Sequence, residues 1–268
     1  VDHLASQSPK RCQARKSSGI TEKSIMANTT VPQRLPKKIG IVIPAHNEAD
    51  SISACLDAIK QAIAQLSSDI VVQTVVVLDS CDDDTLSKVQ NAHVDWLRCE
   101  FRCVGKVRDL GVRYLIEQGA DWIACTDADS IVEADWLVAQ IKHLKAEPTA
   151  MPTTTPTAMI CGVVSIDCWD ALSESTKQQY LAHYQDCMNH RHIHGANLSF
   201  ASQDYLAVGG FDELTCHEDV GLVKKFEQAN LPIIWSNLVR VVTSSRLDAR
   251  AKEGFAHFLR GLENQPSA

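Results

Sequence analysis

The chain has 268 residues, of which 45% are hydrophobic and 22% charged, as is typical of a globular protein with one sizeable core. Its formal net charge of −7 disfavours general nucleic-acid binding, because phosphate contacts need a basic surface. No apolar run approaches the roughly 20 residues that a helix needs to cross a bilayer, so the sequence predicts no membrane span.

Residues 1–38 differ in charge from the rest of the chain. They contain eight lysines and arginines and two acids, a net charge of +6. Since the whole chain has a net charge of −7, residues 39–268 have a net charge of −13. The segment is rich in Ser and Arg and poor in acids, like a transit sequence, but it lacks the apolar region of a secretory signal. We favour a disordered extension, upstream of an alternative start at Met26, over a transit segment.

Ten cysteines raise the question of disulfides or a zinc site. None forms a Cys-x-x-Cys pair, and Cys125 and Cys161 lie in apolar runs, where cysteine acts as a small hydrophobic residue. We therefore expect reduced thiols in a cytoplasmic protein.

Hydrophobic periodicity predicts alternating strands and helices in the first half of the chain. Short β-branched apolar runs predict strands, and apolar residues at helical spacing predict helices. Strands are expected at 39–44, 70–78, 94–99 and 121–126, each followed by a helix, at 50–66, 85–92, 105–119 and 133–147. Asp50 or Ser51 can cap the first helix, and Gly119 closes the third. Four such alternations predict an α/β fold with a doubly wound, mostly parallel sheet and helices on both faces.

The second half of the chain is less regular. We expect a loop at 153–157, a strand at 158–166, a long helix at 170–190, a strand at 233–243 and an amphipathic segment at 248–262. No change of composition and no internal repeat divides residues 39–268, which predicts a single domain.

Acidic segments follow three of the predicted strands: PAHNE (44–48), DSCDDDT (79–85) and TDADS (126–130). Ligands of doubly wound sheets bind at the carboxyl ends of the strands. A fold without a binding role can also end its strands in solvated loops, so this coincidence suggests a site without defining it.

Asp127 and Asp129 are separated by a single small residue. Carboxylates this close repel, and one is pushed toward protonation unless a cation or hydrogen bonds compensate. Two residues apart in an extended segment, the side chains project to the same side and can converge. Because carboxylate oxygens suit hard cations, the pair is either a solvated turn or a divalent-cation site.

Five segments together resemble the family 2 glycosyltransferases of the GT-A fold. In chain order they are IGIVIPAHNEADSISACLDAI (39–59), VVVLDSCDDDT (75–85), TDADS (126–130), GANLSFASQDYLAVGGFDE (195–213) and HEDVGL (217–222). Each motif alone is weak, but their order and spacing match the family over roughly residues 39–230. The resemblance implies a GT-A fold, with a nucleotide-binding half at 39–130 and an acceptor-binding half at 131–268.

The same resemblance implies transfer of a sugar from a nucleotide-diphosphate sugar donor to an acceptor hydroxyl, assisted by Mg²⁺ or Mn²⁺. The run LDSCDDDT (78–85) departs from the DDGSTDGT that is common in the family. The Gln-x-x-Arg-Trp motif and the membrane helices of the processive synthases are absent from the sequence, which implies a soluble, non-processive enzyme.

Carried over by resemblance, Asp129 is the direct metal ligand, and Asp127 holds the ribose or a metal-bound water. Further donor contacts are expected from Pro44, Ala45 and Glu48 on the first nucleotide loop, Asp79 at the nucleobase, Arg108 near it with Lys106 as alternate, and Gly195, Ala196 and Asn197 beneath the sugar. Arg246 and Arg250 can close over the diphosphate, because arginine pairs well with phosphate. Asp82, Asp83 and Asp84 are instead expected to serve the start of a helix.

The catalytic base is expected in the CHEDVG segment (216–221), where Asp219 matches the family's catalytic aspartate. Glu218 and His217 are the other candidates, and a plain helix-start charge pair is the alternative interpretation. Histidines alternate in HRHIH (190–194), but without a Cys or carboxylate pattern nearby they are more typical of a loop or an acceptor site than of zinc.

Three other functional classes remain open. A sugar-nucleotide nucleotidyltransferase would share the sheet and the acids, but it should carry a Gly-rich phosphate loop after the first strand, which PAHNE is not. A glycosidase would need two carboxylates flanking the scissile bond and would release free sugar. A catalytically inactive nucleotide-sugar-binding protein would bind the donor without turnover.

Overall fold

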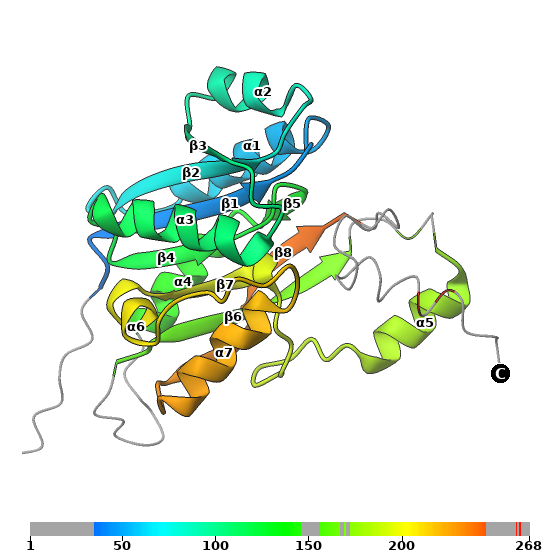
Figure 1. Cartoon of the computed structure of the whole chain (residues 1–268). Coiled ribbons are helices and arrows are strands. Elements are labelled where there is room, and N and C mark those ends of the chain that lie inside the picture. The colour runs from blue at the N-terminus through cyan, green and yellow to red at the C-terminus, as the bar shows by residue number, and fades with distance from the viewer. Residues whose placement is uncertain are drawn as a thin grey trace, which may run out of the picture.

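The computed structural model describes residues 35–145, 156–166, 169, 172–244, 261 and 263. Its sheet has the strand order β3-β2-β1-β4-β7-β6-β8-β5 (Figure 1). The strands are β1 (Lys38–Ala45), β2 (Val71–Asp79), β3 (Asp95–Cys99), β4 (Trp122–Cys125), β5 (Ser130–Val132), β6 (Met159–Ile166), β7 (Leu198–Ala201) and β8 (Ile233–Thr243). The helices are α1 (Ile52–Ala64), α2 (Thr85–Asn91), α3 (Val104–Glu117), α4 (Trp136–Lys145), α5 (Glu174–His183), α6 (Ser202–Ala207) and α7 (Glu218–Gln228), with a 3₁₀ turn, η1, at Gly195–Asn197.

Parallel pairing dominates the sheet. The strands β1 to β4 pair in parallel, and so do β6 and β8. The exceptions are β7, which runs antiparallel to both β4 and β6, and β5, which runs antiparallel to β8. The four β–α units of the first half lie where the hydrophobic pattern predicted them, to within a few residues at each end.

Two hydrophobic clusters cover the two faces of the sheet. Along β1, Ile41 belongs to the cluster formed with α1 and α4, and the next residue, Val42, belongs to the cluster formed with α3 and α7. Successive residues of a strand point to opposite faces, so an unbroken apolar strand requires helices on both. The predicted doubly wound α/β fold is therefore confirmed.

Helix α3 lies against the sheet at Gly111. A methyl group built there would lie 2.8 Å from Cγ2 of Val77 and closer still to Cγ2 of Val42. Glycine at this position therefore allows the helix to approach β1 and β2 more closely than any other residue would.

We expect Gly111→Ala to lower the free energy of unfolding by about 1–3 kcal/mol, because overpacking outweighs the gain in helix propensity. Gly221→Ala on α7 is the matched control, since its new methyl group would meet no atom closer than 3.4 Å. Urea denaturation should show the control unchanged or more stable; equal stability of both variants would contradict the close packing.

The predicted helix ends had mixed outcomes. The helix expected at 170–190 is confined to Glu174–His183, because Tyr184 is extended and its hydroxyl accepts the N–H of Val164 at 2.7 Å. The hydroxyl of Ser51, at the N-cap of α1, donates to Glu48 at 2.6 Å and does not cap the helix. Gly119, with φ of +90°, closes α3 as predicted.

Some predictions fall where the structure gives no description. The leader up to residue 34, the first part of the 153–157 loop, both Arg246 and Arg250, and nearly all of 248–262 lie outside the described residues. Among the helices that are described, none is long and apolar enough to cross a membrane.

Candidate active site

The three acidic segments meet at one edge of the sheet. Since β2, β1 and β4 are neighbours and run in parallel, their carboxyl ends open on the same edge (Figure 1). Side chains tie the first two loops together: His46 Nδ1 lies 2.7 Å from the carbonyl oxygen of Asp79, and Asn47 donates to Asp82. The first two of the three segments are therefore joined directly at this edge.

Pro44 and Ala45, predicted on the first loop, are the last two residues of β1, and only Glu48 lies in the loop that follows. Pro44 is half-buried, and Ala45 and Glu48 are buried. The backbone N–H of Glu48 donates to Thr85 Oγ1 at 2.8 Å, and its carbonyl oxygen accepts the N–H of Ile52 at the start of α1. Glu48 thus joins the first loop to the second and to α1.

Asp79 lies at the end of β2 with its carboxylate buried. Oδ1 accepts the backbone N–H of Phe101 at 2.8 Å and the hydroxyl of Ser80 at 3.1 Å. Phe101 is 44% exposed, and the Lys106 ammonium lies 6.0 Å from the centroid of its ring. Lys106 also forms an ion pair with Glu213 at 2.8 Å. The end of β2 therefore offers an aromatic face beside a carboxylate.

Of the three acids predicted to serve the start of α2, Asp83 does so, whereas Asp82 accepts from Asn47 and Asp84, the N-cap residue, makes no side-chain capping bond. Asp83 Oδ1 accepts the N–H of Thr85, the first residue of α2, and its Oδ2 accepts the N–H of Ala49, both at 3.0 Å. The Asp83 carboxylate is therefore engaged in fixing two loops.

Asp127 and Asp129 lie in a turn between β4 and β5. The N–H of Ser130 donates to the carbonyl oxygen of Asp127 at 3.1 Å, so the extended geometry assumed from the sequence was wrong. The chain turns here because β5 must leave β4 to pair with β8. Burial first, and then the charges of Asp127, Asp129 and Glu48, raise the pKa of the Cys55 thiol. The carboxylates of Asp127, Asp129 and Glu48 therefore all lie near the Cys55 thiol.

Arg108 occupies a buried position between two acids. Its Nη2 lies 2.5 Å from Asp127 Oδ1, and its Nε lies 3.0 Å from Glu218 Oε1. Burial alone would lower the pKa of the guanidinium, but the charges of Asp127 and Glu218 raise it above its ordinary value. The arginine is thus held charged, whereas Lys106 is the basic residue beside Phe101.

The EDVG segment (218–221) begins α7. His217 precedes it with φ of +59°, Glu218 is buried, and Asp219 is half-buried. The two Asp219 oxygens accept the N–H groups of Gly195 at 2.8 Å and Val220 at 2.7 Å. The carboxylate is thereby held against the 195–197 turn.

Asn197 anchors that turn from beneath. Its side chain is fully buried, accepts Trp136 Nε1 at 2.9 Å, and donates to the carbonyl oxygens of Val163 and Val239. All of these contacts are internal to the fold. Gly195 and Ala196 lie on the same turn, so the turn is rigidly placed next to Asp219.

The histidines at 190, 192 and 194 form a ladder. Ring centroids lie 5.4 Å apart for His190 and His192 and 6.1 Å apart for His192 and His194, and Tyr184 stacks on His192 at 4.1 Å. Stacked rings do not direct their nitrogens to a common point. Within the part of the chain that the structure describes, no group of three or more His, Cys, Asp or Glu side chains is arranged to hold a metal ion.

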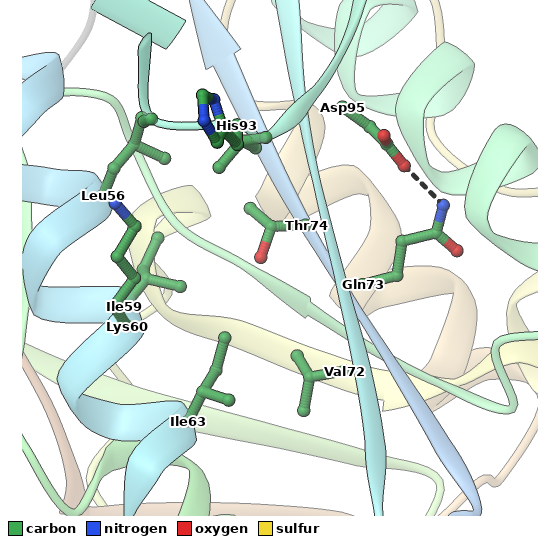
Figure 2. Close-up of a pocket in the computed structure, with 11 residues that line it drawn as sticks. Leu56, Ile59, Lys60, Ile63, Val72, Gln73, Thr74, His93 and Asp95 are labelled. Atoms are coloured by element: carbon green, nitrogen blue, oxygen red, sulfur yellow. Dashed lines mark hydrogen bonds between the residues drawn. The ribbon is translucent and has the colours of Figure 1, made fainter. Parts of the chain in front are cut away.

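A groove of about 310 Å³ lies elsewhere, between α1 and β2. Figure 2 shows Ile59 and Ile63 of α1 facing Val72 and Thr74 of β2. Val72 and Thr74 belong to the amino-terminal half of β2, far along the strand from Asp79. The groove is therefore distinct from the candidate site.

Burial raises the pKa of Glu218 above its ordinary value of 4.5, and the charge of Asp219 adds to the effect, although Arg108 opposes it. Between the unfolded-state pKa and the raised folded-state pKa, the native state binds more protons at this carboxyl than the unfolded state does. The contribution of Glu218 to the free energy of unfolding therefore falls as the pH rises through this range. We therefore expect the melting temperature of Glu218→Gln minus that of the native chain to increase between pH 4.5 and pH 8. Thermal denaturation across that range measures it; a difference independent of pH would contradict the raised pKa.

Comparison with solved structures defines the fold class. The structure resembles the mannosyltransferase PcManGT from Pyrobaculum calidifontis in complex with GDP-Man and Mn²⁺, with a TM-score of 0.59, 18% identity, and coverage of 88% of this chain and 67% of that one. It also resembles glucosyl-3-phosphoglycerate synthase from Mycobacterium tuberculosis in complex with Mn²⁺, UDP and glucosyl-3-phosphoglycerate, with a TM-score of 0.55, 17% identity, and coverage of 87% and 82%. The GT-A fold is thereby confirmed.

Residues 40–165 match the family model for glycosyl transferase family 2. A third similar structure is TarS 1–349 from S. aureus in complex with UDP, with a TM-score of 0.56, 13% identity, and coverage of 77% of this chain and 60% of that one. The chain spans only 36% of a longer TarS structure. Among curated protein sequences, none matches the chain significantly.

Proposed function

We propose that the chain transfers a sugar from a nucleotide-diphosphate sugar to an acceptor hydroxyl. The observation that carries this proposal is the placement of Asp79 and the Asp127–Asp129 turn on one sheet edge, with Asp219 linked to the same turn through Arg108 and Glu218. Similar structures contain GDP-Man or UDP together with Mn²⁺, which supports a nucleotide sugar as donor. The nucleotide-binding half is residues 39–130, and the acceptor-binding half is residues 131–268.

In this proposal, the nucleobase binds at the end of β2. A planar base would stack on the exposed Phe101 ring, and the Asp79 carboxylate would accept a hydrogen bond from the base. Lys106 lies beside the same ring, whereas Arg108 is buried behind the Asp127 turn. The basic residue near the base is therefore Lys106, the alternate of the two candidates.

The residues at the Asp127–Asp129 turn fit a divalent cation. Mg²⁺ and Mn²⁺ sites of this kind typically use one or two protein carboxylates and complete their coordination with phosphate oxygens and water. Asp127 is already paired with Arg108, so Asp129 would be the direct ligand and Asp127 would hold the ribose or a metal-bound water. When bound, the cation would neutralise the charge that develops on the departing diphosphate.

Asp219 would act as the base. Its carboxylate would take the proton of the acceptor hydroxyl while the hydroxyl oxygen bonds to the anomeric carbon and the bond to the diphosphate breaks. The N–H groups of Gly195 and Val220 orient the carboxylate for this step. Arg246 and Arg250 would contact the diphosphate as a closing clamp.

A donor screen tests the proposal. UDP-, GDP- and dTDP-sugars are added with Mn²⁺ or Mg²⁺ in a thermal-shift assay, and mass spectrometry then identifies products formed with hydroxylated acceptors. We expect one nucleotide to stabilise the chain in a cation-dependent way, and an acceptor to gain the mass of one sugar. Formation of a sugar nucleotide from a nucleoside triphosphate, release of free sugar alone, or binding without turnover would each contradict the proposal, and would indicate a nucleotidyltransferase, a glycosidase or an inactive binding protein.

A further inference from the structure

One buried side chain joins the acidic turn to the helix that carries the proposed base. Arg108 on α3 is only 3% exposed, and its guanidinium bonds to Asp127, 19 positions later, and to Glu218, 110 positions later. Its remaining nitrogen, Nη1, is buried and has no hydrogen-bond partner among the residues that the structure describes. Two segments that are distant from α3 in the sequence thus meet at a single planar group.

The turn at 195–197 rests on this network. A methyl group on Gly195 would lie 2.7 Å from Arg108 Nη2 and 3.3 Å from Glu218 Oε1, so the backbone of Gly195 is in direct contact with the ion pair. The N–H of the same glycine donates to Asp219 Oδ2 at 2.8 Å. A shift of the guanidinium would therefore be transmitted to the Asp219 carboxylate through Gly195.

The energetics favour a positional role over a stabilising one. Removing two charges from water costs free energy that their attraction barely repays, so a buried ion pair contributes little net stability. Arginine presents a rigid fork that can hold two carboxylates in fixed directions, which a lysine ammonium cannot do.

We propose that Arg108 is a positioning residue that fixes the Asp127 carboxylate and the Asp219 carboxylate relative to one another. The proposal rests on the proposed function. In this role, Arg108 aligns the donor side of the site with the proposed base. Its Nη2 holds Asp127, and its Nε holds Glu218, next to Gly195 and Asp219.

The test compares Arg108→Met/Glu218→Gln with Glu218→Gln alone. The double variant removes one positive and one negative charge, so the buried group keeps its net charge of −1 and should fold. The single variant keeps the Arg108–Asp127 pair and serves as the matched control. Arg108→Lys is a second variant, which keeps the charge but not the fork.

We expect kcat of the double variant to fall by about 30-fold or more relative to Glu218→Gln, with the donor KM changed by less than about 3-fold. Arg108→Lys should recover only part of this loss. Hydrogen exchange at the Gly195 amide should be faster in the double variant, and this readout needs no substrate. A loss of activity in proportion to the unfolded fraction, or unchanged kcat and unchanged Gly195 exchange, would overturn the positioning role.

The two proposals fail in different ways. If the native chain itself binds no sugar nucleotide, the proposed function fails, while slower Gly195 exchange in the native chain than in the double variant still demonstrates the coupling. If the native chain turns over and the double variant turns over equally well, only the role of Arg108 fails.

Discussion

Asp129→Asn is expected to weaken Mn²⁺-dependent binding of UDP by about 10²-fold or more, because a direct carboxylate ligand supplies much of the attraction for a hard cation. Asp129 lies in the turn before β5, on the edge where Asp127 and Glu48 also raise the pKa of Cys55. Removing one of several neighbouring negative charges relieves repulsion, so the fold should remain intact and the melting temperature should not fall. Isothermal calorimetry with UDP and Mn²⁺ measures the affinity.

Asp135→Asn is the matched control for this experiment. Asp135 is exposed just before α4 and lies outside the proposed site, so its change should leave UDP binding unaltered. Unchanged affinity in Asp129→Asn would show that the direct ligand lies elsewhere, and an equal loss in both variants would point to a general effect of surface charge.

Asp219→Asn is expected to lower kcat by roughly 10²-fold or more with donor affinity little changed, because an amide cannot accept the acceptor's proton. Its carboxylate accepts two backbone N–H groups, and the single carbonyl oxygen of asparagine can replace only one of them. A melting curve and a donor-binding measurement on the variant therefore accompany the kinetics. Until the acceptor is known, slow hydrolysis of the donor provides the rate.

Glu218→Gln should cost less, since Glu218 is buried against Arg108 and acts on the site through it. If Glu218→Gln were inactive and Asp219→Asn fully active, Glu218 would be the base and Asp219 would not. Full activity of both would place the base elsewhere, at His217 or His194. His194 is the weaker choice, because burial together with His192 and His190 lowers its pKa to about 3.

The first half of the fold could be predicted from the sequence because its signals are local. The short length and β-branched residues of the apolar run 39–44 favour a strand covered on both faces, and β1 is so placed. Since parallel strands end on one edge, the order of the elements also predicted that the acids of PAHNE, DSCDDDT and TDADS would meet there. The gathering of the donor-side residues followed from this topology.

What the sequence did not predict depends on contacts between distant segments. Arg108 was expected near the nucleobase, but it is paired with acids 19 and 110 positions later, which no local sequence pattern indicates. The turn at Asp127 is set by the pairing of β5 with β8, and the end of α5 by the bond between Tyr184 and Val164. In each case a tertiary contact overrides local propensity.

Phe101 was also missed, although a signal was present. It is an aromatic residue directly after the third predicted strand, and β3 pairs with β2 in parallel, so the end of β3 lies beside Asp79. An exposed aromatic residue at the ligand-binding edge of such a sheet is a candidate for stacking on a nucleobase.

The most direct test of the account is the release of nucleoside diphosphate from the donor that the screen identifies, measured on the native chain with an acceptor, first in Mn²⁺ and then in excess chelator. The account predicts nucleoside diphosphate as the product in Mn²⁺, loss of the reaction in chelator, and recovery when Mn²⁺ is restored. The same rate of release in chelator, or pyrophosphate in place of nucleoside diphosphate, would contradict it.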